Sequence, residues 1–236
     1  DRIVIGEKKG GKAAIYVLPH SKSEETWKRK WSSKIGGHPY QELRTTAEES
    51  VKDVSFSGDG CRLCIALDSV VQVHDGASGS FIYLLSTLRG IKDVAFTRDG
   101  TRLAVASRDE DKAVTVWATA TGTELFKTQI KDGAVKLAFS PCDTFMVVGS
   151  KSKAQIVKPS TGKVLFMKHR KDKIGAVACS PDGTFFAFGH KNEIEVVDMA
   201  SGSVVGQTIR VDGFAKSLTV VDYYYDGGGG GGDGEI

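Results

Sequence analysis

Short runs in which apolar and polar residues alternate recur along most of the chain. Such runs predict β-strands, because successive side chains of a strand point to opposite faces. One run in each set leads into a turn of the form Ser-x-Asp-Gly or a close variant, which Asp and Gly adopt without strain. These turns begin at Ser57, Thr97, Ser140 and Ser180, at steps of 40, 43 and 40 residues. The pattern therefore indicates an internal repeat of about 40 residues.

A second landmark keeps the same period. A glycine follows an apolar strand at Gly79, Gly122, Gly162 and Gly202, at steps of 43, 40 and 40 residues. Two independent landmarks with one period indicate that the repeat belongs to the fold.

Each unit contains four predicted strands, and their β-branched and aromatic content favours strands over helices. The predicted first strands are 54–56, 94–96, 137–139 and 177–179, and the second strands are 63–67, 103–107, 145–149 and 185–189. The third strands are 70–74, 114–117, 154–157 and 194–197, and the fourth strands are 81–85, 124–128, 164–167 and 204–208. A sheet of four short strands cannot bury both faces alone, so we expect an all-β fold, a β-propeller of four-stranded antiparallel blades.

One strand carries a family resemblance. Val114 to Trp117 resembles the Trp-Asp strand of WD repeats, with Ala118 where Asp is usual. The runs 71–75 and 195–198 keep the Asp and lack the Trp. From Ser50 to about Ile209 the chain is therefore similar to the WD-repeat family of β-propellers, with degenerate repeats and no specific subfamily. The resemblance implies a rigid platform that binds proteins through its loops.

The two ends of the chain predict parts of further blades. We divide it into residues 1–46, a partial first blade with a charged insert, 47–209, four WD-like blades, and 210–236, the start of a further blade with a Gly-rich loop. Strands are expected at 2–5, 12–17 and 214–221. Two interpretations stay open: these strands complete a shared fifth blade, or the chain is part of a seven- or eight-bladed ring. We favour the second, because rings of the WD type most often have seven or eight blades.

Composition narrows the function classes. The 236 residues are 40% hydrophobic with a formal charge of +3, which is far from the basic excess of a chain that mainly binds nucleic acid. No apolar run approaches a membrane span of about 18 residues. We expect Cys61, Cys64, Cys142 and Cys179 to be free thiols, with Cys61 and Cys64 as buried small apolar residues and no metal or other cofactor. Free thiols favour a cytoplasmic protein, with a nuclear or membrane-peripheral place also open.

Two patterns that suggest chemistry have simpler interpretations. Residues 6–12 have the Gly-x4-Gly-Lys spacing of a phosphate-binding loop, but Ala13 replaces the hydroxyl that would hold magnesium. The next residues predict a strand where a helix is required, so we interpret the segment as a hairpin loop. The five histidines lie in no recognisable catalytic pattern, and we expect no enzyme.

Two basic stretches between predicted blades are candidates for partner binding, because such loops line one face of a propeller. The candidate residues are Lys28, Arg29, Lys30, Trp31, Lys34, Lys168, His169, Arg170, Lys171 and Lys173. The first stretch lies in a long charged segment, His20 to Thr46, for which we predict a short helix at 24–31. Long inserts on rigid scaffolds often carry function.

The expected function is a non-catalytic scaffold for protein–protein interaction within a multiprotein complex. Two alternatives stay open. One is a propeller that resembles the endoplasmic-reticulum-anchored exchange factors for the coat-assembly GTPase, on the position of residues 7–12 alone. The other is a propeller that binds RNA through its basic loops, which predicts strongly salt-dependent binding.

Overall fold

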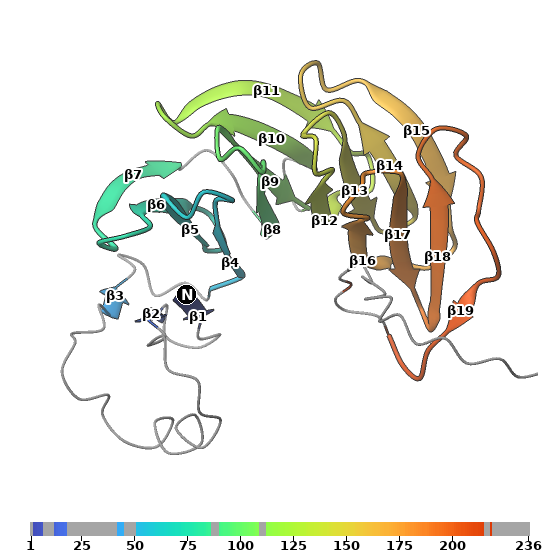
Figure 1. The fold of residues 1–236 in the computed structure, drawn as a ribbon, viewed down its shortest axis with the longest axis horizontal. Coiled ribbons are helices and arrows are strands. Elements are labelled where there is room, and N and C mark those ends of the chain that lie inside the picture. The colour runs from blue at the N-terminus through green and yellow to red at the C-terminus, as the bar shows by residue number, and fades with distance from the viewer. Residues whose placement is uncertain are drawn as a thin grey trace, which may run out of the picture.

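The described part of the chain is an all-β propeller arrangement of antiparallel sheets (Figure 1). A computed structural model describes residues 2–6, 12–17, 42–44, 51–85, 90–108, 112–214 and 218. Four four-stranded sheets follow one another, and in each the strands lie side by side in sequence order. The predicted fold class is confirmed: these sheets are propeller blades.

The strands agree closely with the predicted pattern, and most are longer by one to three residues. The first blade contains β4 (Asp53–Phe56), β5 (Arg62–Ala66), β6 (Val71–Asp75) and β7 (Phe81–Leu85). The second contains β8 (Ile91–Phe96), β9 (Arg102–Ser107), β10 (Ala113–Ala118) and β11 (Thr123–Gln129). The third contains β12 (Ala134–Phe139), β13 (Met146–Ser150), β14 (Lys153–Val157) and β15 (Val164–His169). The fourth contains β16 (Ile174–Cys179), β17 (Phe185–His190), β18 (Glu193–Asp198) and β19 (Ile209–Arg210).

The predicted fourth strand of the last blade, at 204–208, is wrong. Val204 makes only an isolated bridge to Val197, and the strand that pairs with β18 is β19, further along the chain. Gly206 has a φ of +68°, which turns the chain out of the extended conformation within the predicted run. The fourth strand therefore forms only after this turn.

A three-stranded sheet lies beside the first blade, where β1 contacts β4. It contains β1 (Arg2–Gly6), β2 (Lys12–Val17) and β3 (Glu42–Arg44). The antiparallel pairing of β1 with β2 agrees with the predicted neighbouring strands, and β3 adds a strand within the segment expected to be an insert.

Several predictions lie wholly or mainly outside the described residues. They are the loop at 7–11, the helix at 24–31 and the glycine-rich segment at 227–232. Of the strand expected at 214–221, only Phe214 and Leu218 are described, and neither belongs to a strand.

The sheets form an open arc in which the first strand of each blade is innermost (Figure 1). Strands β4, β8, β12 and β16 contact one another in turn, whereas β7, β11 and β15 lie on the outside. The apolar core lies between blades: Cys64 and Val73 of the first blade pack in one cluster with Val94 and Val105 of the second. Adjacent sheets thus bury apolar faces against each other.

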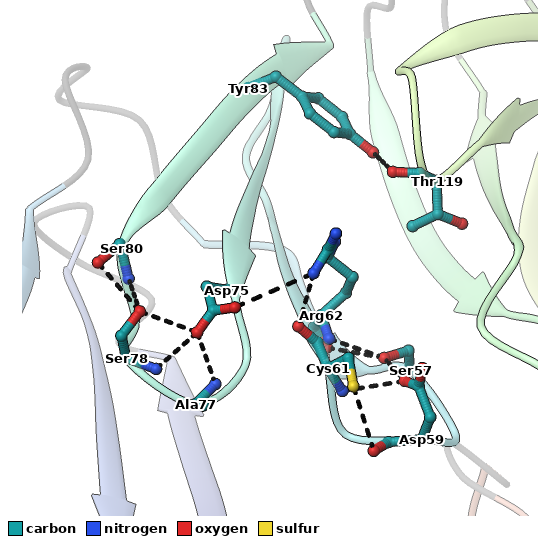
Figure 2. A network of polar contacts seen from close by, with 10 residues as sticks. All are labelled: Ser57, Asp59, Cys61, Arg62, Asp75, Ala77, Ser78, Ser80, Tyr83 and Thr119. Carbon is teal, nitrogen blue, oxygen red and sulfur yellow. Dashed lines mark hydrogen bonds and ion pairs between the residues drawn. The ribbon is translucent and has the colours of Figure 1, made fainter.

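The repeated Ser-x-Asp-Gly turn is a small hydrogen-bonded unit. In the first blade the Ser57 hydroxyl donates to the Asp59 carboxylate at 2.6 Å, and the same carboxylate accepts the Cys61 N–H at 2.9 Å (Figure 2). Gly60 closes the turn with a φ of +70°, and Asp143 takes the corresponding place in the third blade at +56°. Asp is one of the few non-glycine residues that tolerate this conformation, which explains the variant turn.

The second glycine landmark marks a contact between blades. The turn glycine of one blade lies against an aromatic ring in the outer strand of the preceding blade. These pairs are Gly122 with Tyr83, Gly162 with Phe126, and Gly202 with Phe166. The Tyr83 hydroxyl also donates to the Thr119 carbonyl of the next blade at 2.7 Å (Figure 2). In the fourth blade the position of the aromatic residue is taken by Gly206.

Substitution of Gly162 by Ala tests this contact against a matched control. Gly162 and Gly206 have nearly equal φ values, +69° and +68°, so alanine is strained by about 1–2 kcal/mol at both. A Cβ on Gly162 also overlaps the Thr128 hydroxyl and lies 3.2 Å from the Phe126 ring, whereas a Cβ on Gly206 meets nothing within 4 Å. We expect urea titration to show a larger loss of unfolding free energy for Gly162→Ala than for Gly206→Ala. Equal losses in the two variants would contradict the contact of Gly162 with the preceding blade.

Candidate functional site

Buried carboxylates tie the inner strands of neighbouring blades together. Asp53 in β4 accepts the backbone N–H of Val94 in β8 at 3.1 Å. Asp93 in β8 accepts the N–H of Leu137 in β12 at 2.7 Å. One side chain thus satisfies a backbone donor of the next blade at each of these two junctions.

Lys136 of the third blade points back to the second. Its Nζ lies 2.5 Å from the Asp93 carboxylate, and Asp93 is only 5% exposed. Burial raises the pKa of Asp93 to about 6, although Lys136 and the Leu137 N–H oppose the shift. Burial likewise raises the pKa of Asp53.

Sequence reasoning missed this inner network, although the repeat contains a signal for it. The tripeptide Lys-Asp-Val occurs at 52–54 and again at 92–94, at the same place in two repeats. An identical acidic residue beside an apolar first strand indicates a shared role. The corresponding positions in the third and fourth blades hold Lys136 and Ala176, so the carboxylate link is confined to the first two junctions.

The described basic stretch is only partly a loop. Lys168 and His169 are the last residues of β15, which corrects the expectation that the whole stretch lies between blades. The strand continues because Lys153 and Ala154 of β14 pair with these residues. Arg170, Lys171 and Lys173 follow in the loop that leads to β16.

Arg170 joins the third blade to the fourth. Its guanidinium forms a bidentate ion pair with Glu195 of β18, with Nε at 2.6 Å, and lies 5.4 Å from the centre of the Phe188 ring. His190 lies 3.0 Å from the same carboxylate, and Lys168 lies 3.9 Å away. Arg170 and Lys168 are thus committed to a structural contact.

Glu195 is held ionised in this contact. It is 7% exposed, and burial raises its pKa, but the hydrogen bonds from Arg170 and His190 outweigh burial and leave the pKa below its usual value. Planar guanidinium and carboxylate groups match in two parallel hydrogen bonds, which explains the strength of this pair.

His169, Lys171 and Lys173 are the exposed members of the stretch. Partial desolvation and the positive charges of Arg108, Lys136 and Lys92 lower the pKa of Lys173. Lys173 therefore lies near cations of the second and third blades.

The first basic stretch, at 28–34, lies outside the described residues, so its five candidate residues stay predictions. Other loops on the same face as Lys171 carry further exposed cations. Lys131, Lys151 and Lys191 lie in loops that join first or third strands to the strands before them. Asp132 lies among them and is engaged by the Ser152 hydroxyl and, at 3.8 Å, by Lys153.

The turns at the opposite ends of the strands carry carboxylates instead. Hydroxyl and backbone N–H groups of the same turns donate to these carboxylates and lower their pKa values. The carboxylates are those of Asp59, Asp75, Asp99, Asp182 and Asp198. Figure 2 shows Asp75, which accepts the Ser78 N–H at 2.7 Å and its hydroxyl at 2.8 Å. The loop face, which holds residues 130–133, 150–153, 170–173 and 190–192, is thus lysine-rich, and the turn face is rich in ionised aspartates.

The cysteines agree only partly with the prediction. Cys64 is buried as expected, and Cys179 is half-buried, but Cys61 and Cys142 are exposed because both lie in surface turns. Cys142 occupies the Asp position of its turn, and hydrogen bonds from Ser140 and Thr144 lower the pKa of its thiol.

A metal-binding cluster and a membrane-spanning helix are both absent from the described residues. These residues contain no group of three or more His, Cys, Asp or Glu side chains arranged to hold a metal ion. They also contain no helix of the length and apolar character needed to cross a membrane.

Comparisons with known proteins add a likeness of fold. No family model and no curated protein matches the sequence. Among solved structures, the chain is similar to hydrazine synthase of Kuenenia stuttgartiensis, with a TM-score of 0.64 and 19% identity. The similarity covers 75% of this chain and 53% of that one, so this chain matches about half the length of that protein. At this identity the likeness concerns the fold alone.

Asp93→Asn tests the inner network through its pH dependence. Folded Asp93 has a pKa near 6 and an ordinary value of 3.8, so the folded state binds its proton more tightly. The resulting stabilisation is complete below about pH 4 and is lost as the pH rises through 6. We therefore expect the free energy of unfolding in urea to fall over this pH range in the wild type relative to Asp93→Asn. If the difference in unfolding free energy between the two proteins does not change with pH, the buried position of Asp93 is contradicted.

Arg170→Met tests the outer ion pair with the opposite pH dependence. We expect a loss of about 2 kcal/mol at pH 7, because the Glu195 carboxylate stays buried without its main partner. The lowered pKa of folded Glu195 stabilises the folded state above its ordinary value of 4.5, and this is lost as the pH falls. The difference in unfolding free energy should shrink in acid. Lys171→Met, an exposed change in the same loop, is the control.

Proposed function

We propose that the chain is a non-catalytic scaffold of the WD-repeat type, which binds protein partners through its loop face in a cytoplasmic multiprotein assembly. The observation that supports this most strongly is the combination of cross-blade locking with exposed lysines on that face. The locking gives a rigid support, and the lysines give a surface with a preferred partner charge.

Cross-blade contacts occur at several distances from the axis. Asp93 holds the inner strands, and the Tyr83 hydroxyl holds an outer turn. On the turn face, Asp143 accepts the N–H groups of Arg98 and Asp99 at 2.8 and 3.2 Å. A surface supported in this way loses little conformational entropy when it binds, which favours affinity.

The charge difference between the two faces favours one orientation of an acidic partner. Lysines on the loop face attract it, whereas the aspartates of the turn face repel it. The electrostatic field of the two faces orients an approaching partner and speeds its association more than it strengthens the final complex. Specificity therefore depends on the contacts made after docking.

The test compares two double charge reversals in the same blade. Lys171→Glu with Lys173→Glu alters the loop face, and Lys158→Glu with Lys163→Glu alters two exposed lysines beside an outer turn on the other face. Tagged full-length protein is purified from the cells that express it, with nuclease treatment, and bound proteins are quantified. We expect the first variant to lose partners and the second to keep them.

Equal retention in both variants would contradict the use of the loop face. Loss of all bound proteins on nuclease treatment would instead favour the RNA alternative.

A further inference from the structure

Strand β7 is an open edge of the first blade. It lies on the outside of the arc and pairs with β6 on one side, and no described strand pairs with its other side (Figure 1). Three large apolar side chains of this strand are exposed: Phe81 by 58%, Ile82 by 40% and Leu84 by 43%. Tyr83 between them is committed to the second blade through the Thr119 carbonyl. An open edge with exposed apolar side chains is a surface on which another strand can pair.

The outer strands of the first three blades share one exposed apolar position. The pairing register of β7, β11 and β15 shifts at the same point of the repeat. The residue at this point is apolar and exposed in all three strands, as Ile82, Leu125 and Leu165. It is a common feature of the repeat and does not distinguish β7 from the other outer strands.

The absence of charge does distinguish β7. At the place of Phe81, which pairs with the third strand, β11 has Glu124. At the place of Leu84, directly after the aromatic residue, β11 has Lys127, and both charged residues are exposed. Strand β15 ends in a lysine and a histidine, whereas residues 77–88 contain no charged residue. Because charged side chains on an edge strand oppose pairing with a further strand, β7 lacks a protection that β11 and β15 have.

We propose that β7 pairs with β7 of a second copy of the chain in antiparallel orientation, so that two copies form a dimer about a two-fold axis. The interface of such a dimer is one patch that is complementary to itself. With the axis at Tyr83, Ile82 of each copy lies opposite Leu84 of the other, so the exposed apolar residues cover one another. This self-association goes beyond the scaffold function and does not depend on it.

Charge favours β7 of a second copy over the other outer strands of the chain as the occupant. An apolar edge is poorly matched by a strand whose charged side chains lose water on pairing. Of the described outer strands of the four blades, β7 is the one that contains no charged residue, since β19 ends in Arg210. The strand that fits this edge best within the chain is therefore β7 itself.

Charge also favours the antiparallel direction. Asp75 lies where the turn to β7 begins, and hydrogen bonds from Ser78 lower the pKa of its carboxyl group and keep it ionised. Parallel pairing would bring Asp75 of both copies to the same end of the interface, whereas antiparallel pairing places them at opposite ends. Antiparallel pairing also sets the aspartate-rich turn face of one copy beside the lysine-rich loop face of the other, and such opposite charges attract.

Sedimentation velocity of the full chain over a concentration series tests the proposal. One pair of short strands is a small interface, so we expect a reversible dimer with a dissociation constant between about 1 μM and 1 mM. Leu84→Lys gives β7 the residue that β11 has at the same place. We expect this change to weaken the dimer about tenfold or more, because the two-fold axis introduces it twice and each copy loses an apolar cross-strand contact.

Met167→Lys is the matched control. Met167 follows the aromatic residue of β15 as Leu84 follows that of β7, and it is 39% exposed, so the change in charge and in apolar surface is similar. We expect the control to dimerise like the wild type, and urea unfolding confirms that both variants fold. Hydrogen exchange locates the contact: protection of the β7 N–H groups should rise with protein concentration, and that of β11 and β15 should not.

Three outcomes would overturn the β7 dimer. They are a wild type that stays monomeric at about 1 mM, a dimer that Leu84→Lys weakens no more than Met167→Lys does, and association that continues to larger assemblies as the concentration rises. The third outcome contradicts a two-fold axis, because an interface of that symmetry closes after two copies. The scaffold function is tested separately by the loop-face charge reversal, so either proposal can fail while the other holds.

Discussion

Contact between neighbouring blades is the constraint on which the rest of the structure depends. A sheet of four short strands has two apolar faces, and Figure 1 shows the blades packed one against the next along an arc. Apolar clusters fill the space between sheets, but they do not fix the relative position of two blades. Polar links do so: Asp93 reaches the Leu137 N–H, and Arg170 reaches Glu195. A carboxylate buried among apolar strands is costly unless it is bonded, so these links allow one arrangement.

Only some positions of each repeat make contacts between blades, which explains how the other positions can differ between repeats. The turn glycines, the inner carboxylates and certain loop residues such as Arg170 determine how one blade sits on the next. Arg170 and Lys173 show the difference within a single loop, because Arg170 is committed to Glu195 and Lys173 lies among like charges. The size of the whole ring stays a prediction.

The sequence predicts the blades well because each repeat depends on local rules. Glycine at positive φ and alternation along a strand are visible in any single unit, so the turns at Gly60 and Gly162 could be predicted. Cross-blade pairs are different: 43 residues separate Asp93 from Lys136, and 25 separate Arg170 from Glu195. Composition does not show which charges meet, and for that reason the ion pair of Arg170 with Glu195 could not be predicted from the sequence.

Native-state hydrogen exchange at the backbone N–H groups of Val94 and Leu137 tests the central claim most directly. These two N–H groups donate to carboxylates of the preceding blade. If the blades are locked together, both should exchange only on global unfolding, at the rate of the most protected strand N–H groups. Fast exchange at both sites, with the strands beside them still protected, would show that the blades separate without unfolding and would contradict the account.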